Sequence, residues 1–321
     1  MPGFFNKLKS SLNSSSSSKP YDATRGQGPI PKYAPPEWSA APEQSHRLGL
    51  FRDVPEDEYE AAEEFCANVP MEAPRIIPSH QIECINAIGA RAWGISPAEQ
   101  GSRFAGVVTH GPRDGKEKDT KAPGTVRVQT DAQCGDYCLL SDLPIMAGNY
   151  TIPGKVGVYF EILIHYMDPK GFISVGTACR PYPLWRHPGW NRGSAALHLD
   201  DMRKFFEDPD GGRDYTSALK AIRAGDTIGC GHEFQTGALF FTYNGLRLPS
   251  AFTGIYLPRR NFDVYAAVGV EGACDFEVNF GGEFVKWQEG NEWQWKVDGI
   301  FGQLGPVEVL DEELPAYTRM A

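Results

Sequence analysis

Hydrophobic positions in the middle of the chain fall into short runs of β-branched and aromatic residues, separated by turn-forming residues. Two such runs, Thr227–Cys230 and Ala238–Tyr243, lie on either side of a Gln-Thr-Gly turn, and Asn244-Gly245 ends the second run. Asn-Gly favours a type I′ turn, because both central residues of that turn need positive φ. The pattern therefore predicts an antiparallel meander of three strands within Gly225–Phe252.

Apolar runs earlier in the chain predict further strands. They are expected at Phe104–His110, Thr125–Thr130 and Tyr137–Ser141. The chain holds 35 glycines and 25 prolines, and 12% of its residues are aromatic, which suits a mainly β fold with many turns. A length of 321 residues allows one or two domains and is ample for a hydrophobic core.

The same stretches carry a family resemblance. An acidic residue before Ile-Gly-Cys, then Thr-Gly and Phe-Phe-Thr-x-Asn-Gly, resembles the signature of SPRY domains. The similarity continues at Gly157–Ile164, Ile173–Thr177, the Pro-Gly-Trp to Asp-Asp run Pro188–Asp201, and Tyr265–Gly281. These blocks follow the family's order. The resemblance implies a two-sheet antiparallel β-sandwich at residues 101–290 that binds a protein or short peptide and catalyses no reaction.

Residues 46–100 are predicted to form an acidic helical lead before the sandwich. Twelve acidic but only four basic residues lie between Tyr33 and Gln100. One helix is predicted at Glu56–Val69 and a second from Gln81 to about Ala92. The apolar stripe of the first helix consists of Tyr59, Ala62, Cys66 and Val69. We expect both helices to pack on one sheet or edge of the sandwich, with the acidic side chains in solvent.

Residues 1–45 are rich in Ser, Pro and Gly, and they are predicted to be disordered because they bury too little apolar surface. Phe4, Phe5, Leu8 and Leu12 recur at near-helical spacing. Residues 4–12 therefore fit either a short amphipathic helix that touches a membrane surface or partner, or an accidental spacing. The stretch Pro31–Pro42 fits either a docking peptide or a strap over the domain.

Charge and composition narrow the function class. A net charge of −10 and a pI near 5.3 argue against nucleic-acid binding, which needs a concentrated basic face. The sequence shows no run of 18 apolar residues and no secretory leader, so we expect no transmembrane segment and an intracellular protein. The cytoplasm is favoured over the nucleus, because no nuclear localisation cluster is visible. The seven scattered cysteines predict reduced, mostly packed thiols.

The sequence offers no catalytic or metal-binding pattern. Cys134 and Cys138 lack a second Cys/His pair for zinc, and the acidic loop Asp208–Asp214 lacks the closing Glu of a calcium loop. Hydrolase, zinc-protease and Walker motifs are also missing. His165, His198 and His232 lie in or beside strands, where packed, hydrogen-bonded histidines suffice. We therefore expect neither an enzyme nor a metal or other cofactor.

The strongest candidate for partner binding is the loop Cys179–Trp190. It combines Arg180, Tyr182 and Trp185, residue types that dominate interface hot spots, although aromatic loop residues can equally cover the core. Trp190, in the Pro-Gly-Trp block, is expected to be structural. The resemblance places weaker candidates in two other loops, by position rather than by motif; they are Thr130, Asp131, Glu271 and Gly272.

The end of the chain carries a possible docking motif. Residues 291–321 are predicted to close the fold with Trp293 and Trp295 and then to form an acidic, flexible tail. Leu314-Pro315-Ala316-Tyr317 matches a Leu-Pro-x-Tyr motif of the kind that WW domains bind as polyproline II. Some fungal SPRY proteins are adaptors that recruit WW-containing HECT-type ubiquitin ligases in this way.

Three alternatives to the adaptor hypothesis remain open. The tail can be a frayed chain end without a partner. The protein can be a nuclear scaffold subunit of a chromatin or RNA-processing complex, which a localisation cluster would favour. A carbohydrate-binding lectin would need a leader or a sugar site, and is disfavoured.

Overall fold

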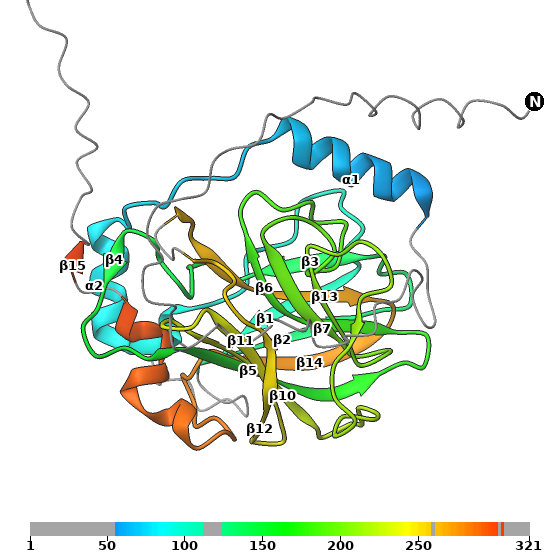
Figure 1. The fold of residues 1–321 in the computed structure, drawn as a ribbon. Coiled ribbons are helices and arrows are strands. Elements are labelled where there is room, and N and C mark those ends of the chain that lie inside the picture. Colours follow the sequence, from blue (N-terminus) through cyan, green and yellow to red (C-terminus); the bar gives the residue numbers. More distant parts are fainter. Residues whose placement is uncertain (1–54, 112–123, 258–260, 301–302, 305–321) are drawn as a thin grey trace, which may run out of the picture. The chain divides into compact units, whose positions relative to one another are not determined.

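Two antiparallel sheets face each other and enclose the main hydrophobic core (Figure 1). The larger has the strand order β1 (Gly106–His110), β2 (Thr125–Thr130), β14 (Cys274–Asn279), β5 (Gly157–Met167), β10 (Thr227–Glu233), β11 (Ala238–Tyr243) and β12 (Leu246–Phe252). The smaller has the order β3 (Tyr137–Leu140), β13 (Val264–Glu271), β6 (Phe172–Cys179), β7 (Ser194–His198), β8 (Arg203–Phe206) and β9 (Arg213–Asp214). The predicted two-sheet sandwich is confirmed.

The structure is a computed structural model, which describes residues 55–111, 124–257, 261–300 and 303–304. The apolar pattern at 4–12, the Pro-rich stretch at 31–42 and the Leu-Pro-x-Tyr motif at 314–317 lie outside the described residues. Among those described, the short strands β4 (Tyr150–Thr151) and β15 (Gln303–Leu304) also pair with each other.

The core is built by strict alternation along the strands. On β5, Val158, Phe160, Ile162 and Ile164 face the smaller sheet and are almost completely buried. Their neighbours point the other way, because successive side chains of a strand lie on opposite faces. β6 and β13 contribute Ile173, Val175, Ala266, Val268 and Val270 from the opposite side. The sheets are thus held together by β-branched and aromatic side chains.

The predicted meander is present in the larger sheet. β10, β11 and β12 are neighbours, and Asn244 and Gly245 between β11 and β12 have φ of 50° and 84°. These positive values are those that a type I′ turn requires. The Asn244 side chain also accepts a hydrogen bond from the Thr227 amide, at 2.9 Å, which ties the turn to the start of β10.

The closing segment packs on the outer face of the larger sheet. Trp287 and Trp295 are buried there against Tyr159 of β5 and Phe240 of β11. Trp293, by contrast, is 51% exposed. Trp295 therefore behaves as predicted and Trp287 also extends the core, whereas Trp293 remains at the surface.

The helical lead has two parts with different attachments. α2 (Ser79–Ile88) and the following 3-10 helix η1 (Gly89–Ala92) contribute Ile85 and Ala92 to the main core. α1 (Glu56–Asn68) buries only Ala62 completely and lies against loops rather than on a sheet (Figure 1). Tyr59 of its predicted apolar stripe is exposed, and Phe65 takes the place next to the sandwich. The described helices are too short or too polar to span a bilayer.

Candidate protein-binding surface

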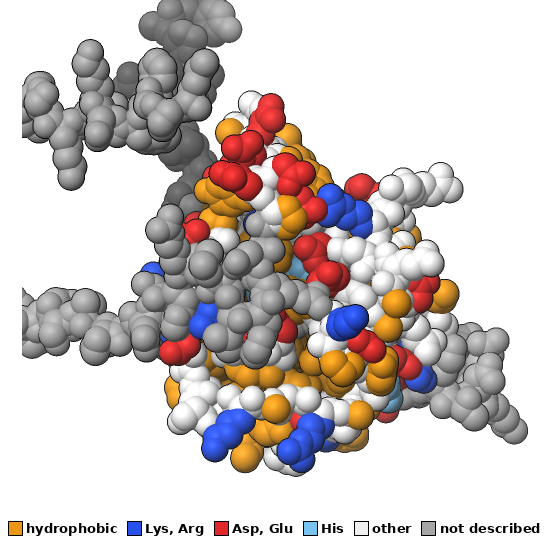
Figure 2. Space-filling view, turned by 90° about the vertical axis from the view of Figure 1, so that its right-hand side faces the viewer, with side chains coloured by type: hydrophobic (Ala, Val, Ile, Leu, Met, Phe, Trp, Pro, Cys, Tyr) orange, Lys and Arg blue, Asp and Glu red, His pale blue; other side chains and the backbone are white. Residues whose placement is uncertain are grey.

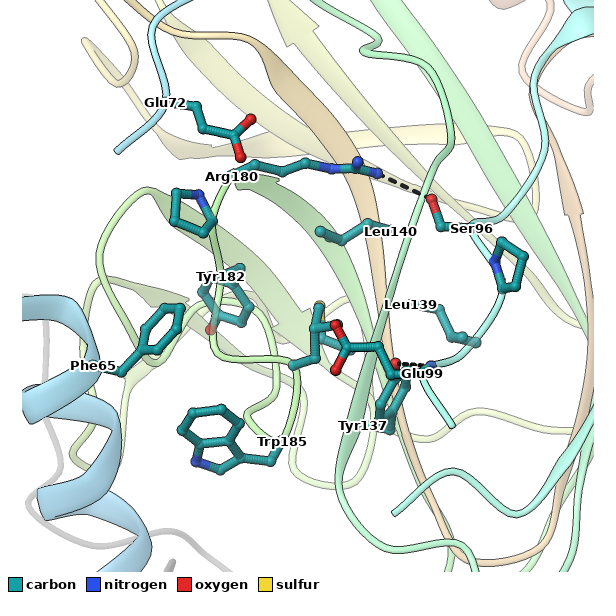
Figure 3. A pocket seen from close by; sticks show the side chains of 14 residues that line it. Phe65, Glu72, Ser96, Glu99, Tyr137, Leu139, Leu140, Arg180, Tyr182 and Trp185 are labelled. Atoms are coloured by element: carbon teal, nitrogen blue, oxygen red, sulfur yellow. Dashed lines mark hydrogen bonds between the residues drawn. The ribbon is translucent and has the colours of Figure 1, made fainter. Parts of the chain in front are cut away.

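A cleft opens where the loop after β6 meets β3, the segment before β1, and α1 (Figure 3). It consists of two adjoining hollows of about 410 and 380 Å³. Both are lined by Glu99, Tyr137, Leu184 and Trp185. Each hollow is large enough for one or two side chains of a partner, and loops on a rigid scaffold are common recognition sites.

The floor of the cleft is apolar because β3 alternates. Tyr137 and Leu139 point into the main core, whereas Cys138 and Leu140 point outward. This outward pair forms a small cluster with Tyr182, and Leu184 packs against it from the loop. At Cys138 and Leu140, the loop after β6 therefore covers the outer face of the smaller sheet. The cleft lies beside this loop.

Two aromatic side chains form the wall opposite β3. Trp185 of the loop is half-buried, and its ring meets Phe65 of α1 edge to face, with centroids 5.6 Å apart and an interplanar angle of 81° (Figure 3). This geometry is the favoured one for aromatic pairs. The predicted site residue Trp185 thus lines the cleft, while its partner Phe65 was not predicted, since it lies about 120 positions away in the sequence.

Arg180 lines the larger hollow, but its guanidinium makes contacts within the protein. Its Nη2 donates hydrogen bonds to Ser96 Oγ at 3.0 Å and to the Ser141 carbonyl at 2.7 Å. The guanidinium also lies 4.1 Å from the centroid of the Tyr265 ring. The carboxylates of Glu72 and Glu99 line the same hollow and are exposed. The rim therefore has an acidic character despite the nearby arginine.

Tyr182 is placed with its ring at the cleft and its hydroxyl inside the protein. The residue is only 4% exposed. Its hydroxyl donates to the His187 carbonyl at 2.6 Å and accepts from the Asn191 amide at 3.4 Å. Burial raises the pKa of this phenol. Tyr182 thus shapes the loop from within, and only part of its ring faces the larger hollow.

The weaker candidates meet at a different place. Thr130 Oγ1 donates to the Gly272 carbonyl at 2.6 Å, which joins the end of β2 to the turn between β13 and β14. Asp131 accepts a hydrogen bond from the Gln133 amide at 2.7 Å. Glu271 is half-buried beside Gly272. The structure brings these four residues together, but they do not line the two hollows of the cleft.

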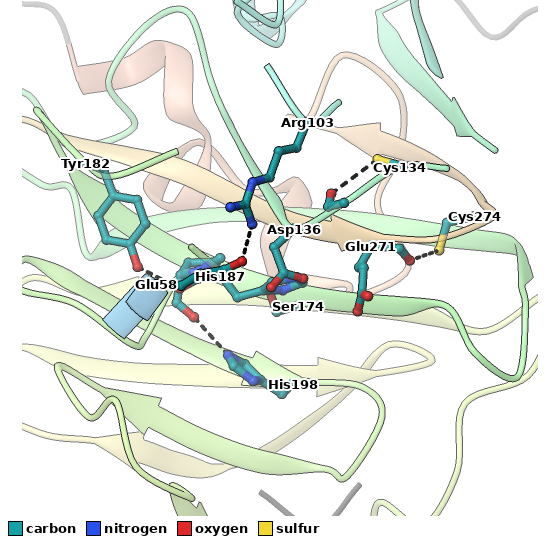
Figure 4. A network of polar contacts seen from close by, with 12 residues as sticks. Glu58, Arg103, Cys134, Asp136, Ser174, Tyr182, His187, His198, Glu271 and Cys274 are labelled. Atoms are coloured by element: carbon teal, nitrogen blue, oxygen red, sulfur yellow. Dashed lines mark hydrogen bonds and ion pairs between the residues drawn. The ribbon is translucent and has the colours of Figure 1, made fainter. Parts of the chain in front are cut away.

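A buried polar network supports the loop from below (Figure 4). His187 lies 2.7 Å from Ser174 Oγ through Nδ1 and 3.3 Å from Asp136 Oδ1 through Nε2, and its ring stacks on Phe172. Burial alone would raise the pKa of Asp136. The hydrogen bond from His187 and the charges of His187, Arg186 and Arg103 lower this pKa by more, so that the net shift is downward.

This Ser-His-Asp arrangement has the residue types of a hydrolase triad but no access for a substrate. Ser174 and His187 are completely buried. A Cβ at Gly269 would lie 2.3 Å from Ser174 Oγ, so even a methyl group does not fit beside the hydroxyl. Nucleophilic attack needs a substrate atom about 3 Å away in open space. The network is therefore structural.

The cysteines and the acidic loop show no metal chemistry. Within the described residues, no group of three His, Cys, Asp or Glu side chains is placed to hold an ion. Cys134 and Cys138 are buried as free thiols in different clusters, and burial raises the pKa of both. Asp208 accepts a hydrogen bond from the Asp210 amide, as in an ordinary turn.

Residues 157–283 match the family model of the SPRY domain. The chain carries a SPRY domain. Protein ssh4 of Sclerotinia sclerotiorum is 28% identical over 84% of this chain and 46% of its own length, and protein ssh4 of Botryotinia fuckeliana is 28% identical over 84% and 44%. A SPRY domain-containing protein of Schizosaccharomyces pombe is 31% identical over 53% of this chain and 41% of its own.

The chain thus spans less than half the length of these curated relatives. A crystal structure of a human SPRY domain is 27% identical, covers 49% of this chain and 93% of its own, and superposes with a TM-score of 0.38. The SPRY domain begins at the first residue of β5, so the earlier strands β1, β2 and β3 complete both sheets from outside the matched region.

Proposed function

We propose that this protein is a non-catalytic interaction module whose SPRY domain holds a peptide segment of a partner in the cleft beside α1. The observation that carries the proposal is the cleft itself, with an apolar floor, an aromatic wall and an acidic rim at the loop end of a rigid sandwich. A partly exposed Trp, such as Trp185 in this cleft, is typical of interface hot spots. An apolar side chain would enter the larger hollow.

The finer proposal is that the module is a cytoplasmic adaptor. In it, Leu314, Pro315 and Tyr317 of the tail dock a WW domain of a ubiquitin ligase while the cleft holds the protein to be modified. The motif in the sequence and the similarity to fungal ssh4 proteins support this arrangement. A Leu-Pro-x-Tyr peptide binds as polyproline II without needing a folded surround.

The experiment is affinity purification with mass spectrometry on the whole chain and three variants. Trp185→Ala removes the loop's half of the aromatic wall, and Tyr317→Ala removes the tail motif. Trp293→Ala is the matched control, because Trp293 is 51% exposed and lines neither hollow. Substitution of Trp185 alone avoids the buried hydroxyl of Tyr182 and so leaves the loop intact.

We expect Trp185→Ala to lose one set of partners, Tyr317→Ala to lose a WW-containing ligase, and Trp293→Ala to retain both. Recovery of every partner by the Trp185→Ala variant would refute the cleft as the binding site. A ligase that is absent from the wild type, or present with Tyr317→Ala, would refute the adaptor role and leave only the interaction module.

A further inference from the structure

The side chains through which α1 contacts the sandwich are acidic or aromatic. Arg103 Nη1 and Glu58 Oε1 form an ion pair at 2.5 Å, and Asn191 Nδ2 donates to Glu63 Oε1 at 3.1 Å. Phe65 packs on Trp185, as described above. α1 carries six acidic residues and no basic one in 13 positions. Figure 2 shows acidic side chains gathered at the top of the view, where α1 lies.

The sandwich presents arginines to this acidic helix. Arg192 donates to the carbonyls of Cys66 and Val69 at the C-terminal end of α1. Those carbonyls carry the negative end of the helix dipole, so a guanidinium there is favourable. With Arg103 near the first turn of the helix, cationic groups lie at both ends of α1. The surface under α1 is thus complementary to an acidic helix in charge and in length.

A third arginine, Arg186, has unused binding capacity at the same place. It is completely buried, its guanidinium lies 4.5 Å from the centroid of the Trp190 ring, and its Nε donates to Asn191 Oδ1 at 3.1 Å. Among the described residues, neither Nη1 nor Nη2 has a hydrogen-bond partner. A planar guanidinium binds carboxylates in a bidentate manner.

Asn191 links this buried arginine to α1, because it accepts from Arg186 and donates to Glu63. Oε2 of Glu58 is likewise buried without a hydrogen-bond partner in the described part of the chain. The helix therefore brings carboxylates close to the buried guanidinium without pairing with it. A helix that places a carboxylate slightly deeper would satisfy groups that α1 leaves unsatisfied.

The attachment of α1 is separate from that of the chain that follows it. α1 has no side-chain cap at its N-terminal end, and Ala62 is its one completely buried residue. The next segment is fixed to the sandwich through the Glu72 amide, which donates to the Arg180 carbonyl at 2.8 Å, and the Arg75 amide, which donates to Asp263 at 2.9 Å. α1 can leave its surface while this segment stays in place.

We propose that the surface formed by Arg103, Arg186, Arg192 and Trp185 is a binding site for an acidic helix with an aromatic residue, and that α1 is its resident occupant. A partner helix of this chemistry displaces α1 and binds in its place. The proposal rests on the proposed function in one respect, since it assumes that this end of the SPRY domain binds protein. It adds a class of partner that takes the place of α1 instead of lying beside it, and an intramolecular competitor.

The test uses a fluorescein-labelled synthetic peptide of residues 55–69 and the full-length chain, with binding followed by fluorescence anisotropy. In one variant, Glu58→Ala and Phe65→Ala weaken the resident helix and leave the domain surface unchanged. A short tether gives the resident helix an effective concentration on the order of millimolar. The weakened variant should therefore bind the peptide about tenfold more tightly than the wild type.

Two controls identify the surface. A peptide with Glu58→Gln and Glu63→Gln should bind the weakened variant several-fold less well, and Arg103→Ala added to that variant should have a similar effect. Circular dichroism of each variant confirms that the sandwich is folded. Binding should also fall as salt rises, since exposed charge pairs are screened.

Equal binding to the wild type and the weakened variant would overturn the proposal, as would equal binding of the Glu→Gln peptide. Failure of any peptide to bind the folded, weakened variant would do the same. These outcomes are distinct from failure of the proposed function. That function is tested by affinity purification with the Trp185→Ala and Tyr317→Ala variants, in which α1 has its wild-type sequence.

Discussion

Replacing Tyr182 with Phe separates the two roles that the structure gives this residue. The ring stays at the cleft, but the hydroxyl is removed from the His187 carbonyl at 2.6 Å and the Asn191 amide at 3.4 Å. Both backbone groups belong to buried residues. A buried polar group left without a partner costs about 1–3 kcal/mol. We expect Tyr182→Phe to lower the free energy of unfolding by about 2 kcal/mol.

Equilibrium unfolding in urea, followed by tryptophan fluorescence, measures this loss. The midpoint should fall while the slope m stays constant, because the area exposed on unfolding is unchanged. A loss of about 2 kcal/mol corresponds to roughly 4–8 °C in Tm for a domain of this size. Tyr166→Phe is the matched control. Tyr166 is 48% exposed and its hydroxyl bonds Asp168 at the surface, so its loss should stay within about 0.5 kcal/mol.

The outcome also bears on binding. Tyr182→Phe should recover the same partners as the wild type in affinity purification, because the ring that faces the cleft is kept. An unchanged urea midpoint would refute the structural role of the hydroxyl. Loss of partners with an unchanged midpoint would mean that the hydroxyl contacts the partner directly, contrary to its inward orientation.

Three further predictions follow from single sites. Gly245→Ala should lower the free energy of unfolding, measured in urea, by at least about 1 kcal/mol. The reason is that φ is 84° there and the added Cβ would lie 2.7 Å from the Lys286 carbonyl oxygen. Gly225→Ala is the control and should cost less, because open space surrounds Gly225. Hydrogen bonds from Arg127 hold the pKa of Asp275 below its usual value, so this pair stabilises the fold above the unfolded pKa of about 3.9 and the contribution is lost as pH falls through the lower folded value. The free energy of unfolding of the Asp275→Asn variant should therefore fall less steeply than that of the wild type as pH drops through this range. An equal fall in both proteins would contradict a stabilising Arg127–Asp275 pair. Of the seven cysteines, exposed Cys84 and partly exposed Cys66 should react with a thiol reagent in the native state. The other five are buried and should react only after unfolding; burial raises the pKa of Cys179 and Cys274 to about 12. Rapid reaction of more than two cysteines would contradict the packing.

Much of the fold could be predicted from short stretches of sequence. β2 and β11 have the predicted boundaries, and the Asn244-Gly245 turn has the predicted positive φ values. β8 and β9 were not predicted, because they are short and their sequences lack a clear alternation. Short edge strands owe their structure to the neighbour with which they pair, so local sequence is a weak guide to them.

The candidate site was predicted in part. The loop after β6 was identified from its Tyr, Trp and Arg content, and Trp185 does line the cleft. The inward hydroxyl of Tyr182, the internal bonds of Arg180 and the position of Phe65 beside Trp185 were not predictable. Residue types indicate that a loop is suited to binding, but they do not show which way each side chain turns.

The sequence by itself determined the local conformations of this protein: alternation encodes the two faces of β5, and Asn-Gly encodes a turn, because both depend on backbone preferences within a few residues. Tertiary structure alone decided that Glu63 of α1 meets Asn191 and that Asp136, Ser174 and His187 meet under the loop. Such contacts join segments far apart in the chain, and they form only when the sheets have closed and buried polar groups must find partners.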